Sequence, residues 1–383
     1  MRTIARVEIF PVGVPITRTF RFSSGNAGTA GGSAELVLVK LTDSDGTVGW
    51  GEGRPMPQWA YETIDTVVAT LRRQLAPAIL GADIWDRAGL HRRMFGAIGR
   101  GPSTGQPVAK AAVDMAVHDL CARAAGVPLR ALLGGGAAAT TVPLSWTCTA
   151  HEAEQVVRDV ETGLAAGYAH FNFKAAVAME TDLAVAREIV QRAPKDAFIW
   201  ADCNQGFKLP EAVYTAQAFE DLGVHLLEQP LPADQFHLMA QLRARTTIAL
   251  AVDEATVSPG DFFGYARAGL VDYLVVKLTR SGGIWPTLQQ LGVAESAGLP
   301  AVVSGLTDGL LTKMAACQVA AAAGIFRPLA LNGSQFLDES AFYPEKARFE
   351  RAGCVYLGEE AGIGVQPDEA ALRAHAITRL AGA

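Results

Sequence analysis

The chain has 383 residues, half of them hydrophobic, and 33 Lys and Arg against 39 Asp and Glu give it a formal net charge of −6. This length allows two domains, or one barrel with an attachment, and the hydrophobic content excludes a disordered chain. Because like charges never form a run of five, we expect no nucleic-acid partner.

The sequence also bears on the cellular compartment. Its first 20 residues have neither a long apolar core nor a small-residue cleavage site. The longest apolar stretch, residues 314–326, is shorter than the roughly 18 residues of a membrane span. The five cysteines are scattered without a CxxC pair, as free thiols in a reducing compartment would be. We therefore expect a cytoplasmic protein with no membrane partner.

The first third of the chain predicts a small mixed domain. Three β-like runs, the last two joined by a turn at Asp45-Gly46, predict an antiparallel sheet over residues 4–12, 34–41 and 48–52. A Gly, Ser and Thr-rich loop between the first two runs carries Phe20 and is expected to close over a ligand. Helical patterns follow at residues 61–75, 84–95 and 109–123.

From residue 142 the pattern changes to short apolar runs that alternate with amphipathic segments. The predicted strands are 142–146, 169–174, 197–202, 224–228, 248–253, 272–277, 299–304 and 328–332. Helical patterns between them include 152–166, 180–193, 210–222 and 283–297. This alternation predicts a (β/α)₈ barrel. The tail from about residue 338 is expected to return to the N-terminal part.

Five of the predicted strands end in ionisable residues: Lys174, Asp202, Glu228, Asp253 and Lys277. Their successive spacings are 28, 26, 25 and 24 residues, about one strand plus one helix with their turns. The C-terminal ends of barrel strands are where ligands and catalytic groups lie. The pattern therefore predicts one shared site.

The three carboxylates would converge above the barrel axis and repel one another unless a divalent cation binds them. An all-oxygen set favours Mg²⁺, with Mn²⁺ as the alternative. A lysine beside a dication has a lowered pKa and can act as a base, which suits removal of a proton next to a substrate carboxylate. The competing interpretation of the lysines is a pair of salt bridges to the carboxylates.

Several motifs resemble those of the enolase superfamily, specifically its muconate-lactonizing-enzyme subgroup. They are ADCNQG (201–206), LLEQP (226–230), VDE (252–254) and VVKLTRSGGI (275–284), supported by DGTVGWGE (45–52) and AGIGV (361–365). The resemblance implies an α/β fold: a modified (β/α)₇β, TIM-like barrel with an α+β capping domain. The implied boundaries are 1–130 with the C-terminal return 340–383 for the capping domain, and 131–339 for the barrel. It also implies a homo-oligomer.

The resemblance further implies roles for matching positions. Asp202, Glu228 and Asp253 would be metal ligands, and Lys174 and Lys277 acid/base catalysts on opposite faces of the substrate. The loops with Phe20 and Trp59 would select the substrate, and Asn204 and Glu254 would support the ligands.

The chain also departs from the subgroup. Asn172 stands where a first lysine is usual, the seventh strand has no His, and the eighth has Asn332 and Ser334 in place of an Asp-x-Asp pair. Mandelate-type chemistry and a free dipeptide substrate are therefore disfavoured. Further substrate-binding candidates are Asn172, Asn332, Asp308 and Trp146. The alternatives are turn residues for Asn332, a helix N-cap for Asp308 and a core aromatic for Trp146.

Three functions remain open from the sequence. The first is a racemase or epimerase of an N-substituted or proline-like amino acid, which works through a metal-stabilised enediolate of its small-molecule carboxylate substrate. The second is a lyase that dehydrates a hydroxy amino acid, or a muconate-type cycloisomerase. The third is a catalytically silent barrel that acts as a binding protein.

Overall fold

A computed structural model describes residues 1–383 except 24, 102–103, 137–140 and 381–383. The N-terminal part forms the predicted antiparallel sheet, with strand order β1-β4-β5. The bounds are Ile4–Pro15 for β1, Ser33–Asp43 for β4 and Val48–Gly53 for β5. A hairpin of β2 (Phe20–Phe22) and β3 (Gly25–Gly28) projects from the loop between β1 and β4.

Helices cover this sheet, and the longest packs directly on β5. They are α1 (Pro57–Ala60), α2 (Ile64–Thr70), a π-helical turn (Leu71–Leu75), α3 (Ala76–Ile79), α4 (Arg87–Ala97), α5 (Pro107–Ala125) and α6 (Leu129–Leu132). A Cβ at Gly51 would lie 2.0 Å from the carbonyl oxygen of Ala112, and one at Gly49 would lie 2.4 Å from that of Ala116. The two glycines therefore let α5 approach the strand closely.

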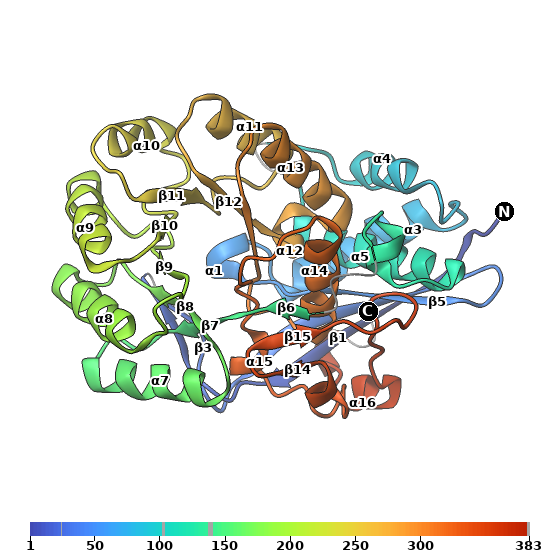
Figure 1. The fold of residues 1–383 in the computed structure, drawn as a ribbon. Coiled ribbons are helices and arrows are strands. Elements are labelled where there is room, and N and C mark those ends of the chain that lie inside the picture. The colour runs from blue at the N-terminus through green and yellow to red at the C-terminus, as the bar shows by residue number, and fades with distance from the viewer. Residues whose placement is uncertain (24, 102–103, 137–140, 381–383) are drawn as a thin grey trace.

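Seven parallel strands form the curled sheet of the barrel, in the order β13-β12-β11-β10-β9-β8-β7 (Figure 1). They are β7 (Ser145–Cys148), β8 (His170–Lys174), β9 (Ile199–Asp202), β10 (Leu226–Glu228), β11 (Ala249–Val252), β12 (Tyr273–Lys277) and β13 (Ala301–Ser304). Two isolated parallel bridges, Ser304 to Ala330 and Leu144 to Leu329, join the ends of this sheet. The predicted (β/α)₇β barrel with a separate capping domain is confirmed.

Helices surround the strands on the outside (Figure 1). They are α7 (Ala153–Ala165), α8 (Met179–Arg192), α9 (Leu209–Leu222), α10 (Phe236–Arg243), α11 (Pro259–Arg267), α12 (Leu278–Ser281), α13 (Ile284–Ser296), α14 (Leu310–Ala322) and α15 (Gly333–Phe336). Within the described part of the chain, no helix combines the length and apolar composition that a membrane span requires.

Two predicted strands differ from the structure. Residues 142–146 divide between β6 (Thr141–Pro143), which pairs with the C-terminal segment, and β7 of the barrel. Residues 328–332 do not form a full strand, because only the two isolated bridges hold them. The first and eighth barrel positions are therefore shorter than their apolar runs.

Alternate residues of the strands point to the barrel interior. One buried cluster fills the barrel on the N-terminal side of the strand ends: Trp200, Leu226, Ala251, Val275, Val302 and Ala330. Two residues further along the same strands come Asp202, Glu228 and Lys277, so these share the inward face. The strand period thus carries the ionisable residues to the barrel mouth.

The C-terminal return connects the two domains. It contains a 3₁₀ turn (Lys346–Arg348), β14 (Glu350–Arg351), β15 (Cys354–Tyr356), α16 (Glu369–Ala374) and a second 3₁₀ turn (Thr378–Leu380). Val12 of β1 forms a bridge with Ala376, and Lys40 of β4 lies 2.6 Å from Glu369. The return therefore packs against the capping sheet, as predicted.

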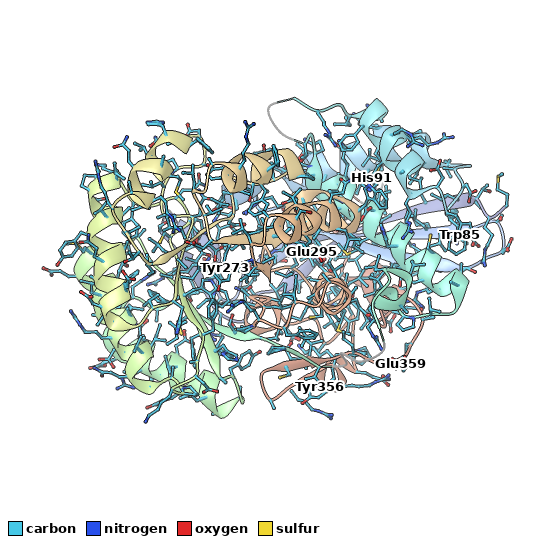
Figure 2. The ribbon with its side chains drawn as sticks, turned by 45° about the horizontal axis from the view of Figure 1, so that its top comes forward. Trp85, His91, Tyr273, Glu295, Tyr356 and Glu359 are labelled. Carbon is cyan, nitrogen blue, oxygen red and sulfur yellow. The ribbon has the colours of Figure 1, made fainter. Side chains whose placement is uncertain are left out.

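A buried carboxylate of α5 also reaches the barrel. Asp114 accepts hydrogen bonds from the backbone N–H groups of Ile284 and Trp285, at the start of α13. It lies 2.6 Å from Nε2 of His91, which is labelled in Figure 2 on the capping domain. Burial opposes its charge, but His118 and His91 lower its pKa below the usual range. Asp114 thus ties the capping domain to a barrel helix.

Candidate active site

The sheet register brings the first three ionisable residues into one row. Lys174 of β8 pairs with Asp202 of β9, which in turn pairs with Glu228 of β10. Asp253 directly follows β11, and Lys277 is the last residue of β12. All five are at most 5% exposed. The five residues therefore form one buried arc at the barrel mouth.

Both lysines form ion pairs within the arc. Lys174 Nζ lies 2.5 Å from Asp202 Oδ2, and Lys277 Nζ lies 2.5 Å from Asp253 Oδ2. The other oxygen of Asp253 accepts from Arg280, which lies in α12. Burial disfavours the charge of Asp253, but Arg280 and Lys277 outweigh it and lower the pKa to about 2. The salt bridges considered as the alternative interpretation are present.

Burial alone would lower the pKa of Lys277, but the charge of Asp253 outweighs burial and raises it. This direction is opposite to the one expected for a lysine beside a dication. The reason is the ion pair, which favours the ammonium form. Lys277 can therefore act as a base only after Asp253 is engaged elsewhere.

Glu228 is the least compensated carboxylate of the arc. Its Oε2 accepts a hydrogen bond of 2.9 Å from Trp200 Nε1, whereas its buried Oε1 has no donor among the described residues. Burial, and then the charges of Asp202 and Asp253, raise its pKa well above the usual value. A free oxygen in negative surroundings is a suitable ligand for a hard cation.

The described side chains are not arranged around a common metal position. No three His, Cys, Asp or Glu residues among them already surround one point as ligands. Lysine and arginine nitrogens occupy oxygens of Asp202 and Asp253 in this arrangement. The oxygen-only donor set and the free oxygen of Glu228 nevertheless fit Mg²⁺, provided that a cation displaces those contacts.

Asn204 and Glu254 lie directly behind the arc. Asn204 Oδ1 accepts from Lys174 Nζ at 2.9 Å, and its Nδ2 donates to Glu254 Oε1 at 3.0 Å. The backbone of Asn204 is left-handed, with φ 42°, a conformation that asparagine tolerates well. Burial, followed by the charge of Asp253, raises the pKa of Glu254 to about 7. Asn204 therefore orients Lys174.

Asn172 lies inside the barrel, two residues before Lys174. Its Oδ1 accepts from Thr147 Oγ1 at 2.8 Å and from Ser145 Oγ at 3.3 Å. Asn332 Nδ2 donates to Thr147 Oγ1 at 3.1 Å, and Asn332 Oδ1 has no donor among the described residues. These residues form a neutral, hydrogen-bonded side of the barrel next to the charged arc.

Aromatic side chains from the capping domain cover Lys174. The rings of Phe20, in β2, and Trp59, in α1, each have their centroid 5.2 Å from Lys174 Nζ. Their centroids are 5.6 Å apart, and Phe22 packs 4.6 Å from Trp59. This aromatic cover places the loop expected to close over a ligand at the barrel mouth.

Trp146 lies outside the barrel interior, whereas Asp308 lies near Lys277. Trp146 points away from the barrel interior, where Nε1 donates to Asp159 of α7 at 2.9 Å. Asp308 accepts from Thr279 at 2.9 Å and from Leu306 N at 2.8 Å, so it is not a helix cap. Gly309 is the N-cap residue of α14 instead.

Comparison with known proteins agrees with this architecture. Residues 5–134 match the model of the mandelate racemase/muconate lactonizing enzyme N-terminal domain, and residues 153–371 match the enolase C-terminal domain-like family. The chain belongs to the enolase superfamily. Within it, the muconate-lactonizing-like subgroup predicted from the motifs is also supported.

Relatives of this superfamily member catalyse different reactions. Muconate cycloisomerase 1 from Rhodococcus opacus is 29% identical, covering 95% of this chain and 96% of its own. N-succinyl-L-Arg/Lys racemase from Bacillus cereus is 25% identical, covering 97% of both. A dipeptide epimerase from Cytophaga hutchinsonii, solved with Mg and D-Ala-L-Val, superimposes with a TM-score of 0.87 at 23% identity, covering 97% of this chain and 98% of its own. The prediction of an enolase-superfamily isomerase is confirmed at this level.

Sequence reasoning missed two residues of this superfamily site. Arg280 occupies one oxygen of Asp253, and Gln229 accepts from the backbone N–H of Asp253 at 2.9 Å. Both lie inside motifs quoted for the resemblance. Gln229 directly follows Glu228, and Arg280 lies three residues after Lys277. Their proximity to a predicted ligand or base was the available signal.

Proposed function

We propose that this enzyme removes and returns the α-proton of a small carboxylate substrate, and that it is a racemase or epimerase of an N-substituted or proline-like amino acid. The observation that carries the proposal is the placement of two buried lysines. Lys174 and Lys277 end strands that are four positions apart in a barrel with eight positions. They therefore approach the axis from opposite sides, as two-base proton transfer requires.

Asp202, Glu228 and Asp253 are the residues that would hold the cation. When bound, Mg²⁺ would supply positive charge to the substrate carboxylate as its α-proton becomes acidic. The same binding would draw Asp253 away from Lys277 and favour the neutral amine, which can accept a proton. The lysine on the other face would remain an ammonium group and would donate a proton to the α-carbon. When that lysine is Lys174, Asn204 holds it.

The surroundings of Lys174 support the substrate class. On one side of the barrel, Asn172 and Asn332 supply amides rather than charges, so a free α-ammonium group bound on that side would lack an anionic partner. The aromatic cover of Phe20 and Trp59 offers an apolar surface to an acyl or ring substituent. Both features favour an amino acid whose nitrogen is substituted.

The proposal can be tested by following α-proton exchange in D₂O by NMR. The Mg²⁺-loaded protein would be incubated with N-acylated amino acids and proline derivatives of each configuration. Deuterium at the α-carbon together with inversion is the expected result. Loss of water without inversion would instead identify a lyase, and absence of Mg²⁺ binding in calorimetry would identify a silent barrel.

A further inference from the structure

A second cavity lies outside the barrel. It has a volume of about 410 Å³, opens to solvent, and is lined by α7, the start of α14, α15 and the C-terminal return. Small-molecule sites typically enclose ~300–1,000 Å³. Trp146 and Tyr168 line it with ring centroids 5.1 Å apart, and Leu310 adds a further apolar wall. The cavity can therefore hold the apolar body of a small molecule.

A buried ionic network forms its floor. Lys313, 2% exposed, lies 2.6 Å from both Ser334 Oγ and Glu350 Oε2. The other oxygen of Glu350 accepts from Tyr168 OH at 2.6 Å. The charge of Glu350 is therefore neutralised within the protein and does not repel an anion strongly.

Basic groups and free donors remain at the cavity. Arg18, Lys346, Arg351 and Glu339 also line it, but Arg18 is paired with Asp159 and Lys346 with Asp338. Arg351 has no acidic partner among the described residues, and its guanidinium lies 4.3 Å from the ring centre of Tyr356, labelled in Figure 2. Gln335, 7% exposed, has a buried Nε2 that lies near Tyr168 but makes no hydrogen bond of standard geometry within the described structure. Arg351 and Gln335 are therefore the two donors at the cavity that could bind an anionic acceptor.

We propose that this cavity is a second binding site, and that its ligand is a small aromatic monocarboxylate. The rings of Trp146 and Tyr168 would contact the apolar body. The carboxylate would face Gln335 Nε2 and the guanidinium of Arg351. Arginine suits this role because its planar group can bind both carboxylate oxygens.

An occupant would also touch the segment that supports the aromatic cover. The short helix α15 follows Asn332 of the barrel and ends at Phe336, whose ring centroid lies 4.8 Å from that of Phe20. Arg18 lies 5.4 Å from the ring centres of both Trp146 and Phe336. A ligand bound in this cavity would therefore contact the helix that packs against Phe20, the ring that lies over Lys174.

Calorimetric titration of the Mg²⁺-loaded protein with benzoate tests the site, with benzyl alcohol as an uncharged probe of similar size. Saturable binding of benzoate is expected, and weaker binding of benzyl alcohol. Arg351→Ala should weaken benzoate binding by about tenfold or more but leave benzyl alcohol nearly unchanged. Equal affinity for the two probes would overturn the assignment of the carboxylate.

Variants separate this cavity from the barrel mouth. Ala347 and Ala166 are exposed at its rim, so tryptophan at either position should block it without disturbing the fold. Ala244→Trp, at the exposed end of α10, is the matched control and should bind benzoate normally. Binding that survives both blocking variants but disappears in Lys277→Ala would place benzoate at the barrel mouth and overturn the proposal, as would no binding at all.

Discussion

Lys277 at the end of β12 lies 2.5 Å from the carboxylate of Asp253, which follows β11. One of the candidate metal ligands therefore also holds one of the candidate bases in its charged form. In the proposed mechanism, cation binding and proton abstraction would be linked through this carboxylate, because it cannot satisfy both partners fully. The enzyme without its cation should consequently be inactive as well as unable to orient a substrate carboxylate.

Lys277→Ala should reduce α-proton exchange by roughly 100-fold or more, the scale of a lost general base. Mg²⁺ affinity should be retained or raised, because Asp253 loses a competing partner. Exchange rates from NMR and Mg²⁺ titration by calorimetry measure the two effects. Lys195→Ala, at an exposed lysine, is the control. Near-normal exchange in the Lys277 variant would rule it out as the base.

Lys174→Ala should affect the two enantiomers of the substrate unequally. If each lysine serves one face, exchange from one enantiomer stops while exchange from the other continues through Lys277. Deuterium incorporation would be followed separately from each pure enantiomer. Equal loss of exchange from both enantiomers would indicate that Lys174 neutralises the carboxylates of the arc rather than acting as a base.

Glu228→Gln should have opposite effects with and without the cation. Without it, the variant removes a buried, uncompensated carboxylate, so unfolding free energy should rise by about 1–3 kcal/mol at neutral pH. Mg²⁺ affinity should fall by about 100-fold or more. Thermal unfolding in EDTA and calorimetry measure these, with exposed Glu180→Gln as the control. A destabilised metal-free variant would contradict the expectation.

Asp114→Asn should lose stability at neutral pH but not in acid. The pKa of Asp114 is lowered in the folded protein, so its contribution is present above the unfolded value and lost as pH falls through the folded value. We expect a deficit of roughly 3 kcal/mol at pH 7 that narrows below about pH 4.

Chemical denaturation across this pH range measures that difference. Asp234→Asn, at an exposed position, should match the parent throughout. A deficit that stays constant with pH would mean that Asp114 acts through packing rather than charge.

The sequence was sufficient for the architecture and the arc, because strand-end residues repeat with the strand and helix unit. It was insufficient where a single-residue shift decides the direction of a side chain. The predicted strand 142–146 ends at Trp146, but β7 runs from Ser145 to Cys148, with Ser145 and Thr147 facing inward and Trp146 outward. A shift of one residue reverses every side chain of a strand.

Contacts between distant segments were equally hidden. Ser334, which stands with Asn332 in place of the Asp-x-Asp pair, bonds Lys313 and Glu350 outside the barrel. No local sequence pattern predicts this network, because its members lie in the separate elements α14, α15 and β14. The lysine ion pairs were visible only as an alternative, because the sequence spacing places charges at a site without saying which partners they choose.

The barrel is closed by single bridges at Leu329 and Ala330 rather than by a full eighth strand. Asn332 lies beyond these bridges, where Thr147 of β7 holds its side chain and the following helix α15 is bonded to the loop after β1 through Thr17 N and Phe336 O. Substitutions in α15 and that loop can reshape one wall of the barrel mouth while β8 to β12 keep the two lysines proposed for proton transfer in place. A change of substrate is therefore structurally separable from a change of reaction in this chain.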